Sequence, residues 1–448
     1  MAHDDPRLEP RRAPDWAGVA RDALARAAWA EPLHVFSALL DSEAAQAVRA
    51  LARAQAAGAA PGPLAGVPFV IKNLFDLRGR PTLAGAQARL GEPPAPRHAA
   101  AVRALLEAGA IPVGLTHMDE YACGATGENV IGGPVRNPLD PGRIAGGSSA
   151  GTAAAIAAGI VPLGLGSDTN GSIRAPAAFC GIWGLRPGAG ALSAEGCFPY
   201  AESLDAVGPM ASDAGLLARA YAVLRGRPPD EAGLPSIAGL RAGILRAGFG
   251  DFATAAANAA VARVAEGFAS ARHIDLPDAE QARAAATLIS TYEAGRNHAR
   301  RGFARRHAGY TAVVRQRMLA GIAVPREWYE AARAWQRAWR ERLAALFQEV
   351  DVLLACATPY AATPLGAESV ILEGRRYAPR ADAGHMTRPV SLAGLPVVAA
   401  PCAGPGLPLG VQLIGPPDGE ALCLRAARAL QAQGLCRSRV QPWPAEGR

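Results

Sequence analysis

Helical and strand-like hydrophobic patterns alternate along the first 120 residues. In some stretches apolar positions recur every three to four residues, as on one face of a helix; in others they form short β-branched or aromatic runs, as in buried strands. One such run follows the turn Pro61-Gly62-Pro63 and ends at Lys72. This alternation is typical of α/β folds. In chain order it predicts helices over 16–30 and 42–57, a strand over 67–72, a helix over 99–108 and a strand over 111–115.

Glycine and other small residues dominate the middle of the chain, over 124–200. Only 151–158 has a helical pattern there, and a strand-like run over 161–165 leads into the Gly/Ser-rich stretch 166–172. From about 213 to 348 the chain is mostly helical and rich in Arg and Ala. The elements predicted at the C-terminal end are strands over 350–354, 396–400 and 410–414, the last two paired as a hairpin, and a helix over 419–433.

Three tryptophans share one predicted helix, at spacings of seven and four: Trp328, Trp335 and Trp339. Such a stripe more often packs against a neighbour than binds a ligand. Without internal repeats or a low-complexity linker, the chain reads as one large α/β domain with a helical insertion. Its predicted parts are N-terminal helices over 1–60, a core over 61–212 with Lys72, Ser148 and Ser172, a mostly helical insertion over 213–348, and C-terminal strands and a helix over 349–448.

The composition excludes several classes of protein. Of the 448 residues, 50% are hydrophobic and only 19% charged, which argues against disorder. The net charge of +7 does not favour nucleic-acid binding, because the arginines are interspersed with acidic residues and the densest cluster, over 296–306, lies on a predicted helix. The apolar stretch 153–166 is broken by Gly and Pro, so no membrane span is expected. Acidic residues within 1–7, where a signal peptide would be basic, predict a cytoplasmic protein.

The cysteine content also agrees with a cytoplasmic protein. The seven cysteines are an odd number, and none has the CxxC spacing. We therefore expect neither a disulfide framework nor a zinc site, and no cofactor. The cysteines are Cys123, Cys180, Cys197, Cys356, Cys402, Cys423 and Cys436.

Two glycine-flanked serine clusters carry the chemistry. They are Gly146-Gly-Ser-Ser-Ala-Gly151 and Asp168-Thr-Asn-Gly-Ser-Ile-Arg174, with a predicted helix and strand between them. Glycines beside a serine allow sharp backbone turns that bring N–H groups close to a reacting carbonyl, as an oxyanion hole requires. Pro176 suits the first turn of a helix, whose N-terminus would lie beside Ser172. A phosphate-binding loop is the alternative, but neither the Walker pattern nor Gly-x-Gly-x-x-Gly is present.

A serine nucleophile needs a base, and the sequence offers an unusual one. None of the eight histidines lies in a recognisable triad motif. Lys72 is the only lysine; the other 45 of the 46 basic residues are arginine. A buried neutral lysine can accept a serine proton, whereas arginine stays protonated. A position at the end of an apolar strand favours the required fall in the lysine pKa.

These residues closely resemble the amidase signature family. The resemblance rests on the two serine clusters together with Gly62-Pro-Leu-Ala-Gly-Val-Pro-Phe-Val-Ile-Lys72-Asn, and it extends from about Pro63 to Leu435. It implies a large twisted mixed β-sheet with helices on both faces. It also implies that Ser172 is the nucleophile, that Ser148, in a cis peptide, relays the proton, and that Lys72 is the base. The backbone amides of Thr169, Asn170, Gly171 and Ser172 would form the oxyanion hole, with Asp168 and Arg174 as structural supports.

Departures from the broad pattern suggest a narrower branch. Asn170 replaces the first glycine of the usual pair, and Ala150 and Thr152 stand where Gly and Ser are common. This version resembles the 1-carboxybiuret hydrolase (AtzE) type, which implies a small ureide-like or carboxylated amide as substrate, ammonia release, a small accessory subunit of the AtzG type, and an oligomer. Tyr121 and Arg388 are the candidate substrate-binding residues. His117 and Arg388 are atypical for the branch.

Two other functions stay open on the sequence. The same chemistry could serve as the glutaminase component of a tRNA-dependent amidotransferase, or the chain could be an inactive binding protein with an amidase fold. The presence of Lys72, Ser148 and Ser172 together argues against the second.

Overall fold

The computed structural model describes residues 15–129, 131–227 and 236–442. The acidic N-terminal stretch 1–7, on which the cytoplasmic prediction rests, lies outside these residues. No helix within the described ranges is long and apolar enough to cross a membrane.

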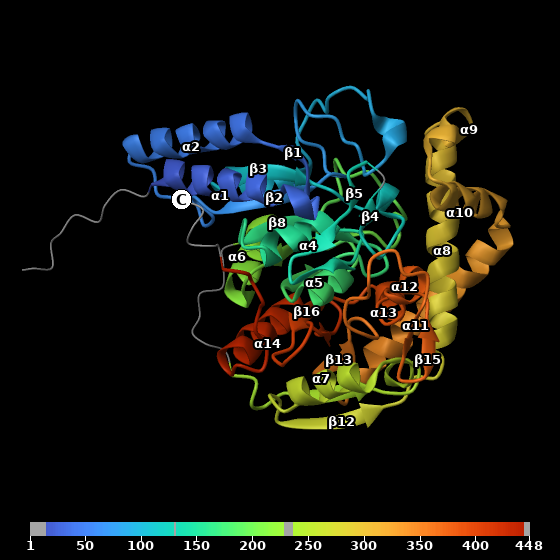
Figure 1. The fold of residues 1–448 in the computed structure, drawn as a ribbon. Coiled ribbons are helices and arrows are strands. Elements are labelled where there is room, and N and C mark those ends of the chain that lie inside the picture. Colours follow the sequence, from blue (N-terminus) through green and yellow to red (C-terminus); the bar gives the residue numbers. More distant parts are fainter. Residues whose placement is uncertain (1–14, 130, 228–235, 443–448) are drawn as a thin grey trace, which may run out of the picture.

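One large mixed sheet organises the molecule, as the resemblance implied (Figure 1). Strand β2 is parallel to β3 and β8, whereas β10 is antiparallel to β8 and β9. Among the described residues the sheet has eleven strands. In spatial order these are β1 (Phe36–Leu39), β3 (Ile111–Thr116), β2 (Pro68–Lys72), β8 (Leu163–Asp168), β10 (Ala206–Ala211), β9 (Trp183–Arg186), β16 (Val397–Pro401), β17 (Gly410–Ile414), β13 (Val352–Cys356), β11 (Arg241–Leu245) and β12 (Ser270–Ile274).

Helices cover both faces of this sheet. On one face lie α4 (Ala150–Ala157) and α5 (Arg174–Cys180), and on the other lie α6 (Ala214–Leu224) and α14 (Glu420–Ala432). The remaining helices are α1 (Trp16–Trp29), α2 (Asp41–Ala56), α3 (Ala100–Glu107), α7 (Ala255–Ala265), α8 (Ala279–Arg300), α9 (Phe303–Arg306), α10 (Ala312–Ala323), α11 (Arg326–Leu346), α12 (Pro379–Asp382) and α13 (Arg388–Ala393).

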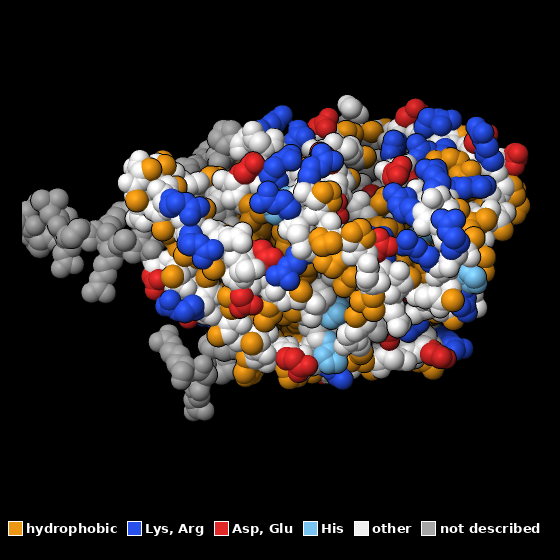
Figure 2. Space-filling model, turned by 90° about the horizontal axis from the view of Figure 1, so that it is seen from above, with side chains coloured by type: hydrophobic (Ala, Val, Ile, Leu, Met, Phe, Trp, Pro, Cys, Tyr) orange, Lys and Arg blue, Asp and Glu red, His pale blue; other side chains and the backbone are white. Residues whose placement is uncertain are grey.

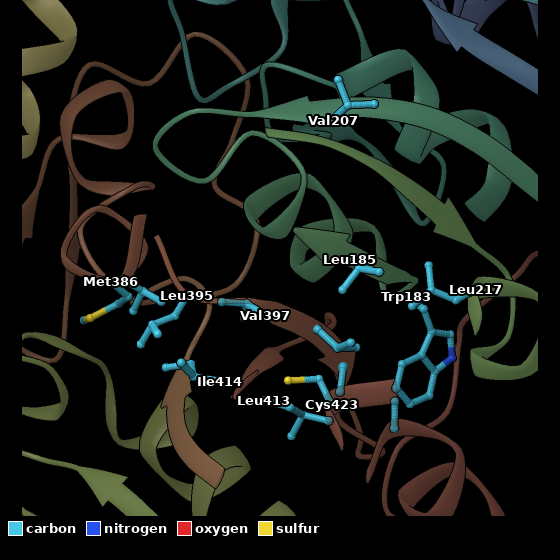
Figure 3. Close-up of a cluster of buried hydrophobic side chains, with 14 of the residues drawn as sticks. Trp183, Leu185, Val207, Leu217, Met386, Leu395, Val397, Leu413, Ile414 and Cys423 are labelled. Carbon is cyan, nitrogen blue, oxygen red and sulfur yellow. The ribbon is translucent and has the colours of Figure 1, made fainter. Parts of the chain in front are cut away.

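The face that carries α6 and α14 is filled by large apolar side chains. Trp183 and Leu185 of β9 meet Leu217 of α6 and Cys423 of α14, and all four are buried (Figure 3). A contiguous core of this size supplies most of the stability of such a domain. It also fixes the central strands that carry the serine clusters.

Helix α4 lies unusually close to the sheet. A Cβ atom at Gly164 of β8 would come within 2.5 Å of Thr152 Cγ2, so only glycine permits this approach. All eight residues of α4 are buried, and five of them are alanine. The small residues of the sequence therefore set α4, with Ser148 and Ser149 at its N-terminal end, directly against the strand that leads to Ser172.

Predicted and observed elements agree for long periodic segments and differ for short ones. Strand β1 lies within the part expected to be N-terminal helices, and β11 and β12 lie within 213–348, the part expected to be mostly helical. The last two predicted strands pair as the expected hairpin, β16 with β17. Of the tryptophan stripe, Trp335 stacks on buried Trp339 at 5.4 Å between ring centroids, but Trp328 is 61% exposed.

The helices α8 to α11 stand together along one side of the molecule (Figure 1), and α8 packs against α10, α11 and α13. On the face shown in Figure 2, basic side chains are interspersed with acidic and hydrophobic ones. The positive net charge is thus distributed on that face rather than gathered in one stripe.

Candidate active site

Lys72 ends β2 in the interior of the sheet and is fully buried. Its Nζ donates to Ser148 Oγ at 2.7 Å and to Ser167 Oγ at 2.8 Å, and lies 3.5 Å from the carbonyl oxygen of Ser167. The strand order places β8, which carries Ser167, beside β2. The lysine amine is therefore held between Ser148 of the first serine cluster and Ser167, the residue just before the second cluster.

Burial lowers the pKa of Lys72 from 10.5 to about 7. Removal of the ammonium group from water favours its neutral form, and the carboxylates of Asp119, Asp168 and Asp205 oppose this only in part. At neutral pH a large fraction of the amine is consequently unprotonated. An unprotonated Nζ can accept a proton from the serine hydroxyl at 2.7 Å.

The backbone around Ser148 has an unusual path. Gly146 has a φ of 80°, and the Gly147–Ser148 peptide bond is cis. The Asp119 N–H donates to the Ser148 carbonyl at 3.3 Å, and the Gly147 N–H donates to the Ala125 carbonyl at 2.9 Å. These contacts hold the Ser148 side chain at Lys72, and glycine at 146 and 147 leaves the backbone free to do so.

Ser172 lies in the loop between β8 and α5, and it faces a small cavity. Its exposed fraction is 8%, whereas Ser148 and Lys72 are at 0%, so a ligand in the cavity meets Ser172 first. The Ser149 N–H donates to the Ser172 carbonyl at 3.2 Å and ties the two serine clusters together. The Ser172 hydroxyl makes no hydrogen bond to another described residue. Hydrogen bonds between a catalytic hydroxyl and its base often form fully only when substrate binds.

A buried ion pair shapes the loop that carries Ser172. Asp168 receives Arg174 Nε and Nη2, both at 2.9 Å, and the N–H groups of Gly171 at 2.7 Å and Ile173 at 3.2 Å. Although burial acts to raise the pKa of Asp168, Arg174 and Arg186 hold it well below its usual range. Asp168 therefore stays ionised, and its carboxylate fixes the path of the loop by accepting hydrogen bonds from the loop's own N–H groups.

The other end of Arg174 joins this loop to the C-terminal part of the chain. Its guanidinium donates to Gln412 Oε1 at 2.7 Å, to Ser391 Oγ at 2.6 Å and to the Thr387 carbonyl at 3.1 Å. All of its polar partners are buried, as a buried charge requires. Arg174 thus links the end of β8 to α13 and β17 through hydrogen bonds.

The expected oxyanion donors differ in their availability. The Gly171 N–H is already bound to Asp168, because the loop curls around that carboxylate. The N–H groups of Thr169, Asn170 and Ser172 have no partner within the described ranges. Three unpaired donors beside a serine hydroxyl can stabilise a developing negative charge on a carbonyl oxygen.

The cavity in front of Ser172 is strongly basic. Arg317 of α10 and Arg388 of α13 both line it, together with Gly147, Asn170 and Tyr200. Neither arginine has an acidic side chain within 4 Å among the described residues, and Arg388 Nε is buried without a hydrogen-bond partner there. Burial and the nearby Arg317 lower the pKa of Arg388 to about 10, which still leaves it charged at neutral pH. The cavity therefore presents to a ligand two cations that have no ion-pair partner within 4 Å in the described part of the chain.

A third arginine at the rim is compensated. Arg380 of α12 also lines the cavity, but its Nη2 lies 2.5 Å from the Glu128 carboxylate and its side chain is largely exposed. Within the described ranges no group of three or more His, Cys, Asp or Glu side chains could hold a metal ion.

Two residues singled out from the sequence lie apart from the cavity. The Tyr121 ring is buried and stacks on Tyr310 at 4.8 Å between centroids, with Phe198 and His298 around it. His117 is buried against Gly132, and burial lowers its pKa to about 4. Neither residue lines the cavity.

Some site residues were not recognised from the sequence. Ser167 precedes Asp168 directly, and its position on an inward-facing strand end is a signal that could have been used. Arg317 gave no signal, because it lies 145 positions beyond Ser172 on an ordinary Arg-rich helix.

The fold and this grouping of two serines around a neutral lysine define a hydrolase. A family model for amidases matches residues 19–424. AtzE, the 1-carboxybiuret hydrolase subunit of Pseudomonas sp. (strain ADP), is 45% identical over 391 residues, which cover 84% of this chain and 85% of that protein. A glutamyl-tRNA(Gln) amidotransferase subunit of Deinococcus deserti is 34% identical over 92% of each chain.

Solved structures support the same family assignment. One, reported as "An unexpected vestigial protein complex reveals the evolutionary origins of an s-triazine catabolic enzyme", is 42% identical with a TM-score of 0.91 over 96% of this chain and 97% of that one. Another, an amidase, is 35% identical with a TM-score of 0.85 over 93% and 96%. The chain belongs to the amidase signature family, and it is an amidase.

Proposed function

We propose that this amidase hydrolyses the C–N bond of a small carboxylated, ureide-like amide of the 1-carboxybiuret type, with Ser172 as nucleophile. The observation that carries the chemistry is the contact of 2.7 Å between Ser148 and the Lys72 amine, a substantial fraction of which is neutral at neutral pH, directly behind the serine that faces the cavity. The observation that carries the substrate class is the pair of uncompensated arginines in front of it.

The first half-reaction forms an acyl-enzyme. Lys72 accepts the Ser148 hydroxyl proton while Ser148 accepts that of Ser172, and Ser172 Oγ forms a bond to the amide carbon. The carbonyl oxygen becomes an oxyanion that the N–H groups of Thr169, Asn170 and Ser172 stabilise, each donor contributing roughly 3 kcal/mol. The C–N bond then breaks, and the proton returns from Lys72 through Ser148 to the departing nitrogen, which leaves as ammonia.

The second half-reaction uses the same groups. A water molecule gives its proton to the relay and attacks the acyl carbon, and the bond to Ser172 Oγ breaks as that oxygen regains a proton. The products are free enzyme and the acid of the acyl group, which for a ureide is a carbamic acid. Lys72 ends in the neutral state in which it began.

The arginines select the substrate. A guanidinium binds a carboxylate in two parallel hydrogen bonds, and Arg388 offers a buried, unpaired Nε for this purpose. Arg317 adds a second positive charge on the same cavity. A relative that is 45% identical is named for a carboxylated biuret, in agreement with this charge.

Ammonia release from 1-carboxybiuret, biuret and propionamide tests the proposal. We expect the wild-type enzyme to turn over the carboxylated compound with the highest kcat/KM and Ser172→Ala to lose activity. The absence of turnover of any amide by the wild type, or undiminished turnover by Ser172→Ala, contradicts the mechanism.

A second candidate activity, glutamine hydrolysis for an amidotransferase, has support from the 34% identical amidotransferase relative. Asn170 in place of the usual glycine favours the hydrolase instead. If charged tRNA stimulated glutamine hydrolysis by this protein, the amidotransferase function would be favoured over the hydrolase function. For the third alternative, an inactive binding protein, the test is whether a fluorophosphonate labels Ser172.

We also propose that the chain forms an oligomer and works with a small accessory subunit. A solved structure with a TM-score of 0.91 is described as a protein complex, which supports a partner of this kind. The native mass of the purified chain, alone and after co-expression with a small protein encoded beside it, tests this proposal. An unchanged monomer mass in both cases contradicts it.

A further inference from the structure

A second hollow lies behind the loop that carries Ser172. It has a volume of about 320 Å³, compared with about 50 Å³ for the cavity in front of that loop. Leu74, Phe198 and Val207 give it an apolar lining, and polar side chains, among them Ser167 and Asp205, also line it. We call it the rear hollow and the other the front cavity.

The two spaces share one wall. Only Ala122, Thr169 and Tyr200 line both of them, as far as the described residues go. Ala122 has a single methyl group, and Thr169 turns its hydroxyl to Asp205 Oδ1 at 2.5 Å. Tyr200 therefore supplies the one large side chain that separates the rear hollow from the front cavity.

Tyr200 is fixed in this position. Its backbone N–H donates to Asp205 Oδ2 at 2.9 Å, and its carbonyl accepts Asn297 Nδ2 at 3.2 Å. Its hydroxyl donates to Cys123 Sγ at 3.8 Å, and the residue is 5% exposed. A side chain held at both its backbone and its tip acts as a fixed barrier rather than a swinging lid.

We propose that Tyr200 limits the length of the substrate, and that the rear hollow is a latent subsite for an uncharged alkyl or aromatic chain. The proposal rests on the assignment of Ser172 as nucleophile. The charges of the two spaces differ, because Arg317 and Arg388 draw an anionic group to the front cavity. In the rear hollow Asp205 and exposed Glu202 stand against a single cation, Arg301, so its apolar lining rather than a net positive charge would select the ligand. Removal of the Tyr200 ring joins the two spaces and lets a long chain extend past the catalytic loop.

Fluorophosphonates test this without knowledge of the natural substrate. In the reaction Ser172 Oγ bonds to phosphorus, the P–F bond breaks, fluoride leaves, and the serine proton passes to Ser148 and Lys72. We would measure second-order labelling rates with an ethyl and an octyl reagent for the wild type, Tyr200→Phe and Tyr200→Ala. The ratio of octyl to ethyl rates is the readout, and it is independent of the fraction of active protein.

We expect this ratio to rise about tenfold in Tyr200→Ala and to stay at the wild-type value in Tyr200→Phe, which keeps the ring. Tyr200→Leu, a less drastic truncation, should give an intermediate ratio and serves if the alanine variant does not fold. If Ser172 is labelled but the ratio is unchanged in the truncated variants, Tyr200 does not limit substrate length, although the assignment of Ser172 as nucleophile stands. No labelling of Ser172 in any of the proteins overturns both.

Discussion

Lys72 Nζ and Ser148 Oγ lie 2.7 Å apart and both side chains are fully buried, and the hydrogen bonds of the lysine that the structure shows go only to Ser148 and Ser167. Three nearby aspartates, Asp119, Asp168 and Asp205, raise its pKa, but none of them forms a hydrogen bond with it in the described part of the chain. This separation matters, because a carboxylate in direct contact would keep the amine protonated. The Lys72 amine is thus placed beside Ser148 without a carboxylate in direct contact that would stabilise its protonated form.

The pH dependence of the reaction follows from this arrangement. As the proposed base, Lys72 can act only when it is neutral, and burial brings its pKa to about 7. We expect kcat/KM to rise with pH, to reach half its maximum near pH 7, and to level off above that value. A pH–rate profile between pH 5 and 9 measures this. A rate independent of pH over that range, with the protein folded throughout, would argue for a different base.

Asp168 should be essential for stability as well as for loop geometry. Asp168→Asn leaves Arg174 buried without its carboxylate, and breaking a buried ion pair costs about 3–5 kcal/mol. Urea unfolding measures the change. Glu330→Gln is the matched control, because the Arg326–Glu330 pair is 77% and 57% exposed, and solvent screening leaves such a pair little effect on stability. Equal effects in the two variants would refute the structural role of Asp168.

Arg388 should set the preference for carboxylated substrates. Its replacement by methionine keeps the chain volume and removes the charge, so we expect KM for a carboxylated amide to rise roughly 10- to 100-fold. The KM for an uncharged amide should change little. Arg326→Met, at an exposed position on α11, is the control. A similar loss for charged and uncharged amides would mean that Arg388 only supports the fold.

Gly171 should tolerate no side chain. Its φ is 126°, and a Cβ atom would come within 2.2 Å of Thr387 Oγ1. We expect Gly171→Ala to displace the N–H groups beside it and to lower kcat by about 10²-fold or more. Gly239→Ala, where no atom lies within 4 Å of the new Cβ, controls for the general effect of the substitution. A near-normal kcat in Gly171→Ala would show that the loop is not the oxyanion hole.

The sequence predicted the part of the site that local patterns encode. Strand β2 with Lys72 at its end and the loop before α5 both follow from short motifs, because glycine, proline and strand-forming residues act on their immediate neighbours. The packing of α4 on β8 could not be read in this way, since it depends on the distance between Gly164 and Thr152.

Long-range partners escaped prediction for the same reason. Arg317 enters the cavity because α10 packs on α8, and no local pattern distinguishes it from the other arginines of its helix. Strand β9 was missed because Trp183 to Arg186 is only four residues long and is buried on both faces. The outer strands β11 and β12 lie in a segment whose helical majority masked them.

The central claim is that neutral Lys72 deprotonates Ser148, and Lys72→Arg tests it most directly. Arginine keeps the positive charge and the approximate length of the side chain, but it cannot lose a proton at neutral pH. Ammonia release at pH 8 would be compared between the wild type and a Lys72→Arg protein whose folding is verified by its circular dichroism spectrum. We expect a loss of at least about 10³-fold in kcat/KM for Lys72→Arg. A rate close to that of the wild type would contradict it.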